Sequence, residues 1–83
     1  MYEQITIVLI SHKSRDKVIK FIQNLPKSFK IVVVDNSEDK KLEELILKNQ
    51  KNTKIKLTKN NGYGSAINYA RKFINTKFLF VFN

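Results

Sequence analysis

The chain has 83 residues, enough for one small domain and too few for two. It contains no cysteine, which excludes a disulfide framework and a cysteine-rich zinc module and fits a reducing cytosol. No stretch approaches the roughly 20 consecutive apolar residues that span a bilayer, so we expect a protein that is at most peripheral to a membrane.

The formal net charge of +9 raises the question of nucleic-acid binding. All of the 16 basic residues except Arg15 and Arg71 are lysines, scattered from Lys13 to Lys77. Nucleic-acid surfaces are typically clustered and rich in arginine, whereas scattered lysines are typical of a solvated surface. We therefore predict no nucleic-acid partner and keep a small basic nucleic-acid-binding protein as the less favoured alternative.

The first half of the chain alternates between strand and helix patterns. Residues 5–10 are β-branched and almost all apolar, which predicts a central strand. Apolar side chains then recur with helical spacing up to Pro26 and predict a first helix that ends before it. Residues 31–34 repeat the central-strand pattern. The polar residues 35–37 predict a helix cap, and the two acidic residues after them suit the positive end of a second helix.

The second helix is expected to turn its leucine and isoleucine side chains inward and to fade in the polar run 48–54. The inward set is Leu42, Leu45, Ile46 and Leu47. Residues 55–58 alternate between apolar and polar side chains, which predicts a short strand near the edge of the sheet.

The last third of the chain combines a loop, a helix and a strand. Both glycines lie in the turn-rich segment 59–64, and from Ser65 the apolar spacing predicts a third helix. The unbroken apolar run 78–82 predicts an inner strand buried on both faces. We therefore place the nearby aromatic side chains in the core, namely Tyr69, Phe73, Phe78, Phe80 and Phe82.

Strands that alternate with helices predict an α/β fold with a parallel sheet and right-handed crossovers. We expect a Rossmann-like three-layer sandwich with about four strands in the order 3-2-1-4 and three helices. In that order the sheet changes its direction of growth after the third strand, and ligands bind at the carboxyl ends of the strands near that point. The polar segments at the strand exits are therefore the candidate site.

Two side chains at these exits are candidates for ligand contacts. Asp35 ends a hydrophobic strand, where a carboxylate can accept hydrogen bonds from a base or from ribose hydroxyls. The alternative for Asp35 is helix capping. His12 can present a flat ring to a base or donate to a phosphate. A single histidine without a carboxylate or nucleophile beside it forms no catalytic constellation, and the alternative is a surface-loop histidine.

The segment Asn60-Asn61-Gly62-Tyr63-Gly64 can admit a pyrophosphate against bare backbone and the amino end of the third helix. It lacks the G-x-G-x-x-G spacing and follows the third strand, which disfavours a dinucleotide fingerprint. The alternative is a tight turn in which Asn and Gly supply positive φ angles.

Three segments, taken in this order, resemble the start of a family 2 glycosyltransferase. They are residues 9–13 (Leu-Ile-Ser-His-Lys), the valine run 31–37 that ends in Asp-Asn-Ser, and residues 60–68, with the pattern Asn-x-Gly-x-Gly-x-Ala-x-Asn. The likeness covers nearly the whole chain, and the rhamnosyltransferase-like branch looks closest. The resemblance implies a GT-A fold whose amino-terminal half binds a nucleotide diphosphate sugar.

The same resemblance implies which residues contact the nucleotide. Asp35 would bind the base or ribose, the residues leaving the first strand would line the base pocket, and the loop and third helix would flank the nucleotide. His12 stands where many relatives have a tyrosine. The implied nucleotide-binding set is Ser11, His12, Asp35, Asn61, Gly62 and Asn68.

Relatives follow the fourth strand with an Asp-x-Asp-like motif that holds a divalent metal, Mn²⁺ or Mg²⁺, on the diphosphate, and later supply a carboxylate base. Neither occurs in residues 1–83. We therefore expect residues 1–83 to be the amino-terminal nucleotide-sugar-binding part of the domain, truncated before that motif. We predict no catalytic residue, no metal ligand and no sugar transfer by these residues alone.

The implied function is transfer of a sugar from a nucleotide diphosphate donor to a glycan or lipid-linked acceptor, in cell-surface polysaccharide biosynthesis. The implied location is the cytoplasm, at the inner face of the membrane. The main alternative is a non-catalytic nucleotide-binding or interaction module, with a partner that covers the edge of the fourth strand.

Overall fold

The computed structural model describes residues 4–49, 52–59 and 63–82, and in these ranges strands and helices alternate strictly. The strands are β1 (Ile5–Ser11), β2 (Lys30–Asp35), β3 (Thr53–Leu57) and β4 (Phe78–Phe82). The helices are α1 (Arg15–Gln23), α2 (Lys40–Asn49) and α3 (Tyr63–Arg71). The strands pair in parallel in the order β3-β2-β1-β4, so the predicted α/β fold and strand order are confirmed.

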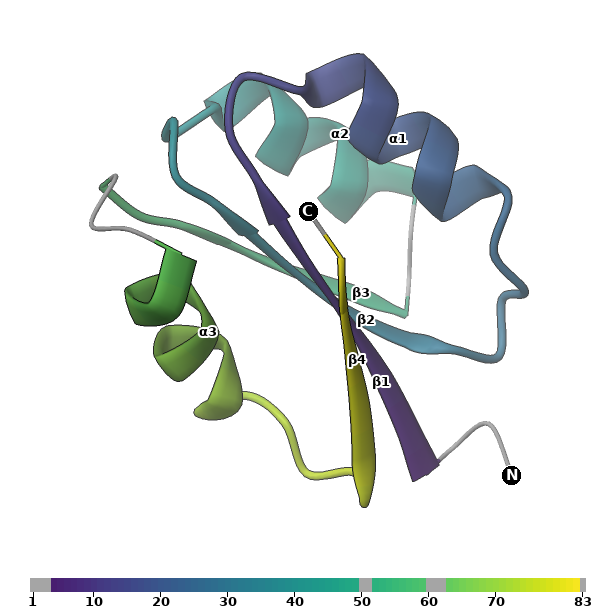
Figure 1. Cartoon of the computed structure of the whole chain (residues 1–83). Coiled ribbons are helices and arrows are strands. Elements are labelled where there is room, and N and C mark those ends of the chain that lie inside the picture. The colour runs from purple at the N-terminus through teal and green to yellow at the C-terminus, as the bar shows by residue number, and fades with distance from the viewer. Residues whose placement is uncertain (1–3, 50–51, 60–62, 83) are drawn as a thin grey trace.

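Helices cover both faces of the sheet, which gives three layers (Figure 1). Because successive strand side chains point to opposite faces, each buried strand contributes to two separate apolar clusters. Under α1 and α2 the buried cluster consists of Ile7, Leu9, Val18, Ile22, Ile31, Val33, Leu42, Ile46 and Ile55. Under α3 it consists of Val8, Ile10, Val32, Val34, Ala66 and Ala70, where the small alanines let the helix approach the sheet closely.

The prediction that β4 is buried on both faces is wrong for the described structure. Phe78, Phe80 and Phe82 are 54%, 52% and 42% exposed, so placing them in the core is wrong too. These side chains lie on the same face as Ile7 and Leu9, and in the described ranges the buried cluster under α1 and α2 does not extend to β4 at the end of the strand order. Its other face packs better, because Leu79 and Val81 contact the cluster under α3.

The other aromatic predictions have a mixed outcome. Tyr69 packs against the cluster under α3, and Phe73 is half-buried with its ring centroid 5.4 Å from that of Tyr69. Phe82 reaches the opposite layer, where its ring centroid lies 5.3 Å from that of Phe21 on α1. Aromatic side chains therefore pack around both sides of the sheet, and the row on β4 is the exposed part.

The inward face of α2 is narrower than predicted. Leu42 and Ile46 are fully buried and Leu45 is half-buried, but Leu47 is 68% exposed and its predicted inward position is wrong. Leu47 comes one residue after Ile46, and a step of about 100° around the helix turns it toward solvent. Element bounds also shift slightly, because β3 is residues 53–57 rather than 55–58 and α3 starts at residue 63 rather than 65.

The topology places the candidate site. After β3 the chain crosses to the other face of the sheet through α3 and returns beside β1 as β4. The carboxyl ends of β1 and β4 therefore meet at the point where the sheet changes its direction of growth, which is where ligands bind in such sheets. No helix in the described ranges is both long and apolar enough to cross a membrane.

Two leucines of α2 provide a matched test of the core. We expect Leu42→Ala to lower the free energy of unfolding by about 2–5 kcal/mol, because it leaves a cavity at a fully buried position. The total free energy of unfolding of a domain of this size is of order 5–10 kcal/mol, so this loss would remove a large fraction of its stability. Leu47→Ala at the exposed position should change it by no more than about 0.5 kcal/mol. Urea unfolding followed by circular dichroism measures both, and equal losses would contradict the buried face assigned to α2.

Candidate functional site

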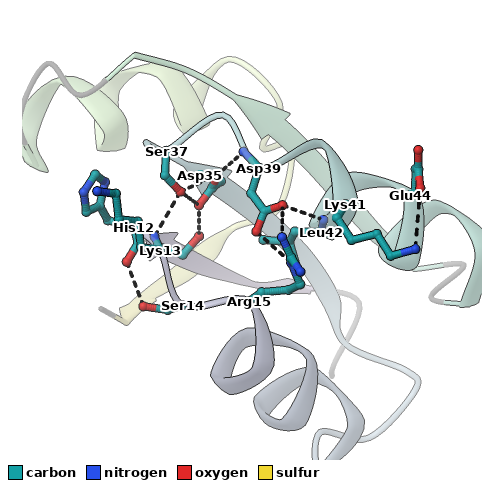
Figure 2. A network of polar contacts seen from close by, with 11 residues as sticks. His12, Lys13, Ser14, Arg15, Asp35, Ser37, Asp39, Lys41, Leu42 and Glu44 are labelled. Carbon is teal, nitrogen blue, oxygen red and sulfur yellow. Dashed lines mark hydrogen bonds and ion pairs between the residues drawn. The ribbon is translucent and has the colours of Figure 1, made fainter.

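The pairing of β1 with β2 continues beyond the strands through side chains. Ser11 lies opposite Asp35 in the parallel register, an offset of 24 residues. The same offset recurs between Lys13 and Ser37 and again between Arg15 and Asp39. The two segments that leave the sheet are therefore joined at three successive levels, first at the strand ends and then twice beyond them. Figure 2 shows the two levels beyond the strands, Lys13–Ser37 and Arg15–Asp39.

Asp35 lies at the centre of this arrangement and is only 1% exposed. Its Oδ1 accepts from the Ser11 hydroxyl at 2.9 Å, and both its oxygens lie within 3.0 Å of the Ser37 hydroxyl. Its Oδ2 also accepts the backbone N–H of Asp39 at 2.8 Å. Three protein donors thus occupy both oxygens, which is what a buried carboxylate requires.

The cap of α2 is supplied by Asp39 rather than by residues 35–37, so that part of the capping prediction is wrong. Asp39 Oδ1 accepts the backbone N–H of Leu42 at 3.1 Å, which is the N-cap contact for a helix that begins at Lys40. Residues 36–38 instead form the turn between β2 and this cap, and Glu38 has a positive φ of 53° there. Asp35 supports that turn by holding the Asp39 N–H.

Arg15 and Asp39 form a two-pronged ion pair between the first turns of α1 and α2. Arg15 Nε donates to Asp39 Oδ2 at 2.9 Å, and a second guanidinium nitrogen donates to Oδ1 at 3.0 Å. This hydrogen bonding holds the pKa of the Asp39 carboxyl below its ordinary value of 3.8 and raises the pKa of Arg15. The pair joins the two helix starts next to the strand exits.

His12 and Asn36 are two further polar side chains at the strand exits. His12 is exposed, and Figure 2 shows its ring pointing away from the hydrogen-bond network. Asn36 is anchored on both sides, because its backbone N–H donates to the Ser11 carbonyl at 2.8 Å and its Oδ1 accepts from Thr58 at 3.0 Å. The amide nitrogen of Asn36 has no acceptor among the described residues.

A pocket of about 510 Å³ opens where the exits of β1 and β4 meet. Its walls are largely apolar side chains from β1, α1 and β4, and its polar groups come from the end of β1, from the loops after β1 and β2, and from α1. The lining residues are Leu9, Ile10, Ser11, His12, Ser14, Lys17, Val18, Phe21, Asn36 and Phe82. An apolar wall with a few polar groups is typical of small-molecule sites.

A second, larger hollow of about 890 Å³ lies beside it, between the first turns of α1 and α2. Its ten lining residues are all polar or charged, so no aromatic or apolar side chain lines it for a base to stack against. The apolar pocket at the β1 and β4 exits is therefore the better candidate site.

The structure brings together part of the predicted nucleotide set. Ser11 and His12 line the pocket, and Asp35 lies beneath it with its carboxylate turned into the protein. Asn68 is exposed on α3, on the opposite face of the sheet from α1, and does not line this pocket. Asn61 and Gly62 lie outside the described residues. Contact of any of these residues with a nucleotide stays a prediction.

Sequence reasoning missed the supporting residues of the site. Ser37 and the Arg15–Asp39 pair join the two loops, yet each looked like an ordinary cap or surface residue. The signal that connects them is the constant offset of 24 residues. That offset becomes readable only once the register between β1 and β2 is known.

The described residues do not fit the divalent metal that the family resemblance implies. No group of three or more histidine, aspartate or glutamate side chains in the described ranges could hold a metal ion. Asp35 is already held by three donors and Asp39 by Arg15, so neither presents a free carboxylate. No step of the chemistry is therefore assigned to a metal on these residues.

Comparison with known families gives a match that covers almost the whole chain. The model of Glycosyl transferase family 2 matches residues 3–83. The chain belongs to glycosyl transferase family 2. This membership supports a glycosyltransferase-like function and agrees with the observed parallel sheet. Comparison with curated proteins gave no match, and neither did comparison with solved structures.

In this family 2 chain, the buried carboxylate can be tested by an isosteric change. We expect Asp35→Asn to lower the free energy of unfolding by about 1–3 kcal/mol, because an amide nitrogen faces donors where an oxygen accepted them. Urea unfolding measures the loss. Glu44→Gln, at an exposed acidic position on α2, is the control and should change stability by no more than about 0.5 kcal/mol. An unchanged Asp35→Asn midpoint would mean that the carboxylate does not hold the two loops.

The ion pair predicts a defined pH dependence. Because the folded pKa of Asp39 lies below its unfolded value, the charged form stabilises the fold above about pH 4 and that contribution is lost as pH falls through the lowered pKa. Asp39→Asn keeps an N-cap acceptor but removes the charge. Thermal unfolding measures the difference in stability between wild type and Asp39→Asn. We expect wild type to unfold at the higher temperature at pH 7, and we expect this difference to shrink below pH 4. A difference that stays constant with pH would argue against the Arg15 pairing as its source.

Proposed function

We propose that residues 1–83 form the nucleotide-binding part of a glycosyltransferase that takes a nucleotide diphosphate sugar as donor. The pocket at the exits of β1 and β4 is the observation that carries this proposal. Its volume of about 510 Å³ falls in the range of roughly 300–1,000 Å³ typical of small-molecule sites. Its place at the change in sheet growth is where α/β sheets bind nucleotides.

The pocket offers each kind of contact that a nucleoside needs. The His12 ring is free among the described residues to lie against a base, and apolar side chains such as Leu9 and Phe82 form the wall. The amide nitrogen of Asn36 can donate to a base carbonyl or a ribose oxygen. Lys17 lines the same pocket and supplies a positive charge toward a diphosphate.

The buried Asp35 supports this pocket from below. A direct bond to the nucleotide would require one of its three present donors to give way. Its main contribution in our proposal is to hold the Ser11 and Ser37 hydroxyls and thereby the two loops that carry His12 and Asn36.

Family membership supports a glycosyltransferase-like function, and the wider function is part of our proposal. We propose that the bound sugar passes to a glycan or lipid-linked acceptor in the synthesis of a cell-surface polysaccharide, at the cytoplasmic face of the membrane, as in the rhamnosyltransferase-like branch. These residues would supply donor binding, and the carboxylates of Asp35 and Asp39 at the strand exits are both engaged within the protein. The acceptor base and the metal are not assigned to them.

A second candidate is an interaction module, and the exposed row Phe78, Phe80 and Phe82 favours it. This row lies on an edge strand, whose outer backbone groups can pair with another strand. The two candidates differ in what they bind, because only the first requires a nucleoside diphosphate.

The test has two measurements, each made with UDP, GDP and dTDP. Isothermal titration calorimetry measures the affinity for each nucleotide, alone and with Mn²⁺ or Mg²⁺. NMR of the isotopically labelled chain then shows which backbone amides each nucleotide shifts. We expect at least one of them to bind and to shift the backbone amides of Ser11, His12 and Asn36. Loss of base stacking in His12→Ala should weaken that binding about tenfold or more, whereas His12→Tyr should retain it. Mg²⁺ replaces Mn²⁺ in the NMR arm, since Mn²⁺ broadens signals.

Absence of binding by all three nucleotides would overturn the proposed donor site. Self-association or partner capture that depends on Phe80, measured by sedimentation of Phe80→Lys against wild type, would then support the interaction module. Binding that shifts amides only at the opposite end of the sheet would also contradict the assigned pocket.

A further inference from the structure

Resting on the proposed function, we propose that Ser37 is the positioning residue that holds His12 in place for the nucleotide base. Ser37 does not line the pocket, whereas His12 does. The two are connected through a single peptide unit, the one between His12 and Lys13.

The Ser37 hydroxyl lies between the two loops, where it donates one hydrogen bond to Asp35 and accepts another from Lys13. Its hydroxyl hydrogen is directed to the Asp35 carboxylate, whose oxygens lie 2.9 and 3.0 Å away. Because that hydrogen is engaged, the Ser37 oxygen presents its lone pairs elsewhere and accepts the backbone N–H of Lys13 at 2.9 Å. The buried carboxylate therefore orients the hydroxyl that receives the other loop.

The peptide unit between His12 and Lys13 is held at both ends. Its N–H donates to Ser37 Oγ, and its carbonyl, which belongs to His12, accepts from the Ser14 hydroxyl at 2.8 Å. Fixing this peptide plane fixes the backbone on the carboxyl side of His12. Lys13, which follows this peptide unit, has a φ of 51°, a left-handed conformation that is uncommon for residues other than glycine and persists where the surrounding structure restrains it.

The His12 side chain depends on this backbone because nothing else in the described structure holds it. The ring is exposed, points away from the polar network and has no partner among the described residues (Figure 2). A ring on a freely moving loop would have to be ordered each time a base bound, and that ordering weakens affinity. A clamped peptide unit removes part of this loss in advance.

The sequence offers a clean set of variants. Ser37→Ala removes the acceptor of the Lys13 N–H, and Ser37→Thr keeps a hydroxyl at the same place. Ser28→Ala is the matched control, because Ser28 is an exposed turn serine in the connection that leads into β2, away from the strand exits. Urea unfolding of each variant separates a general loss of stability from a local effect.

The first readout needs no ligand. We expect Ser37→Ala to speed hydrogen exchange of the Lys13 amide about tenfold or more and to increase the nanosecond motion of the residue 12–13 backbone in ¹⁵N relaxation. Ser37→Thr should restore both, and Ser28→Ala should change neither. Unchanged Lys13 exchange in a folded Ser37→Ala protein overturns the inference whether or not any nucleotide binds.

The second readout is a double-mutant cycle on the nucleotide that binds best among UDP, GDP and dTDP. Ser37→Ala should weaken binding about three- to tenfold in the wild-type background and leave it unchanged in the His12→Ala background, because Ser37 acts through His12. Equal losses in both backgrounds overturn the positioning role while leaving the proposed function standing. If wild type binds none of the three, the proposed function fails and the exchange experiment alone decides the role of Ser37.

Discussion

The buried carboxylate of Asp35 is the interaction on which the arrangement of the candidate site depends. It is almost completely removed from solvent, and its two oxygens are occupied by the hydroxyls of Ser11 and Ser37 and by a backbone N–H at the start of α2. A carboxylate in this position is stable only when its oxygens are satisfied, and the same donors that satisfy it belong to the two loops at the strand exits. Burial of one charge thus imposes the shape of both loops.

The parallel register explains why these contacts form a series. β1 and β2 align with an offset of 24 residues, and the Ser11–Asp35, Lys13–Ser37 and Arg15–Asp39 contacts continue that offset past the ends of the strands. Every second residue of a strand points to the same side of the sheet. The two segments continue side by side past the strand ends, so alternate residues of one can still contact alternate residues of the other. The pocket beside this series belongs to a member of glycosyl transferase family 2, and these three contacts hold the segments that border it.

Periodicity alone predicted most of the fold. Apolar runs such as residues 5–10 and 31–34 are dense enough to require a covered parallel sheet, and the strand order follows from short right-handed connections. The errors concern side chains that are apolar in the sequence pattern but exposed in the structure. Leu47 is apolar but faces solvent, and Phe80 is exposed because the described cluster under α1 and α2 on its face of the sheet does not reach β4. An apolar pattern shows which side chains can be buried, but it does not show whether another element of the fold covers them.

The sequence by itself determined the α/β class, the order of the strands, the family and the prediction that polar residues gather at the strand exits. These properties depend on the local spacing of apolar residues and on the order of motifs, and both can be read directly from the sequence. Only the tertiary structure decided that Asp35 faces inward, that Asp39 caps α2 and that Ser37 joins the two loops. Those roles depend on which side chains meet across a gap of 24 residues, and that is set by the register and twist of the sheet rather than by any residue's neighbours in sequence.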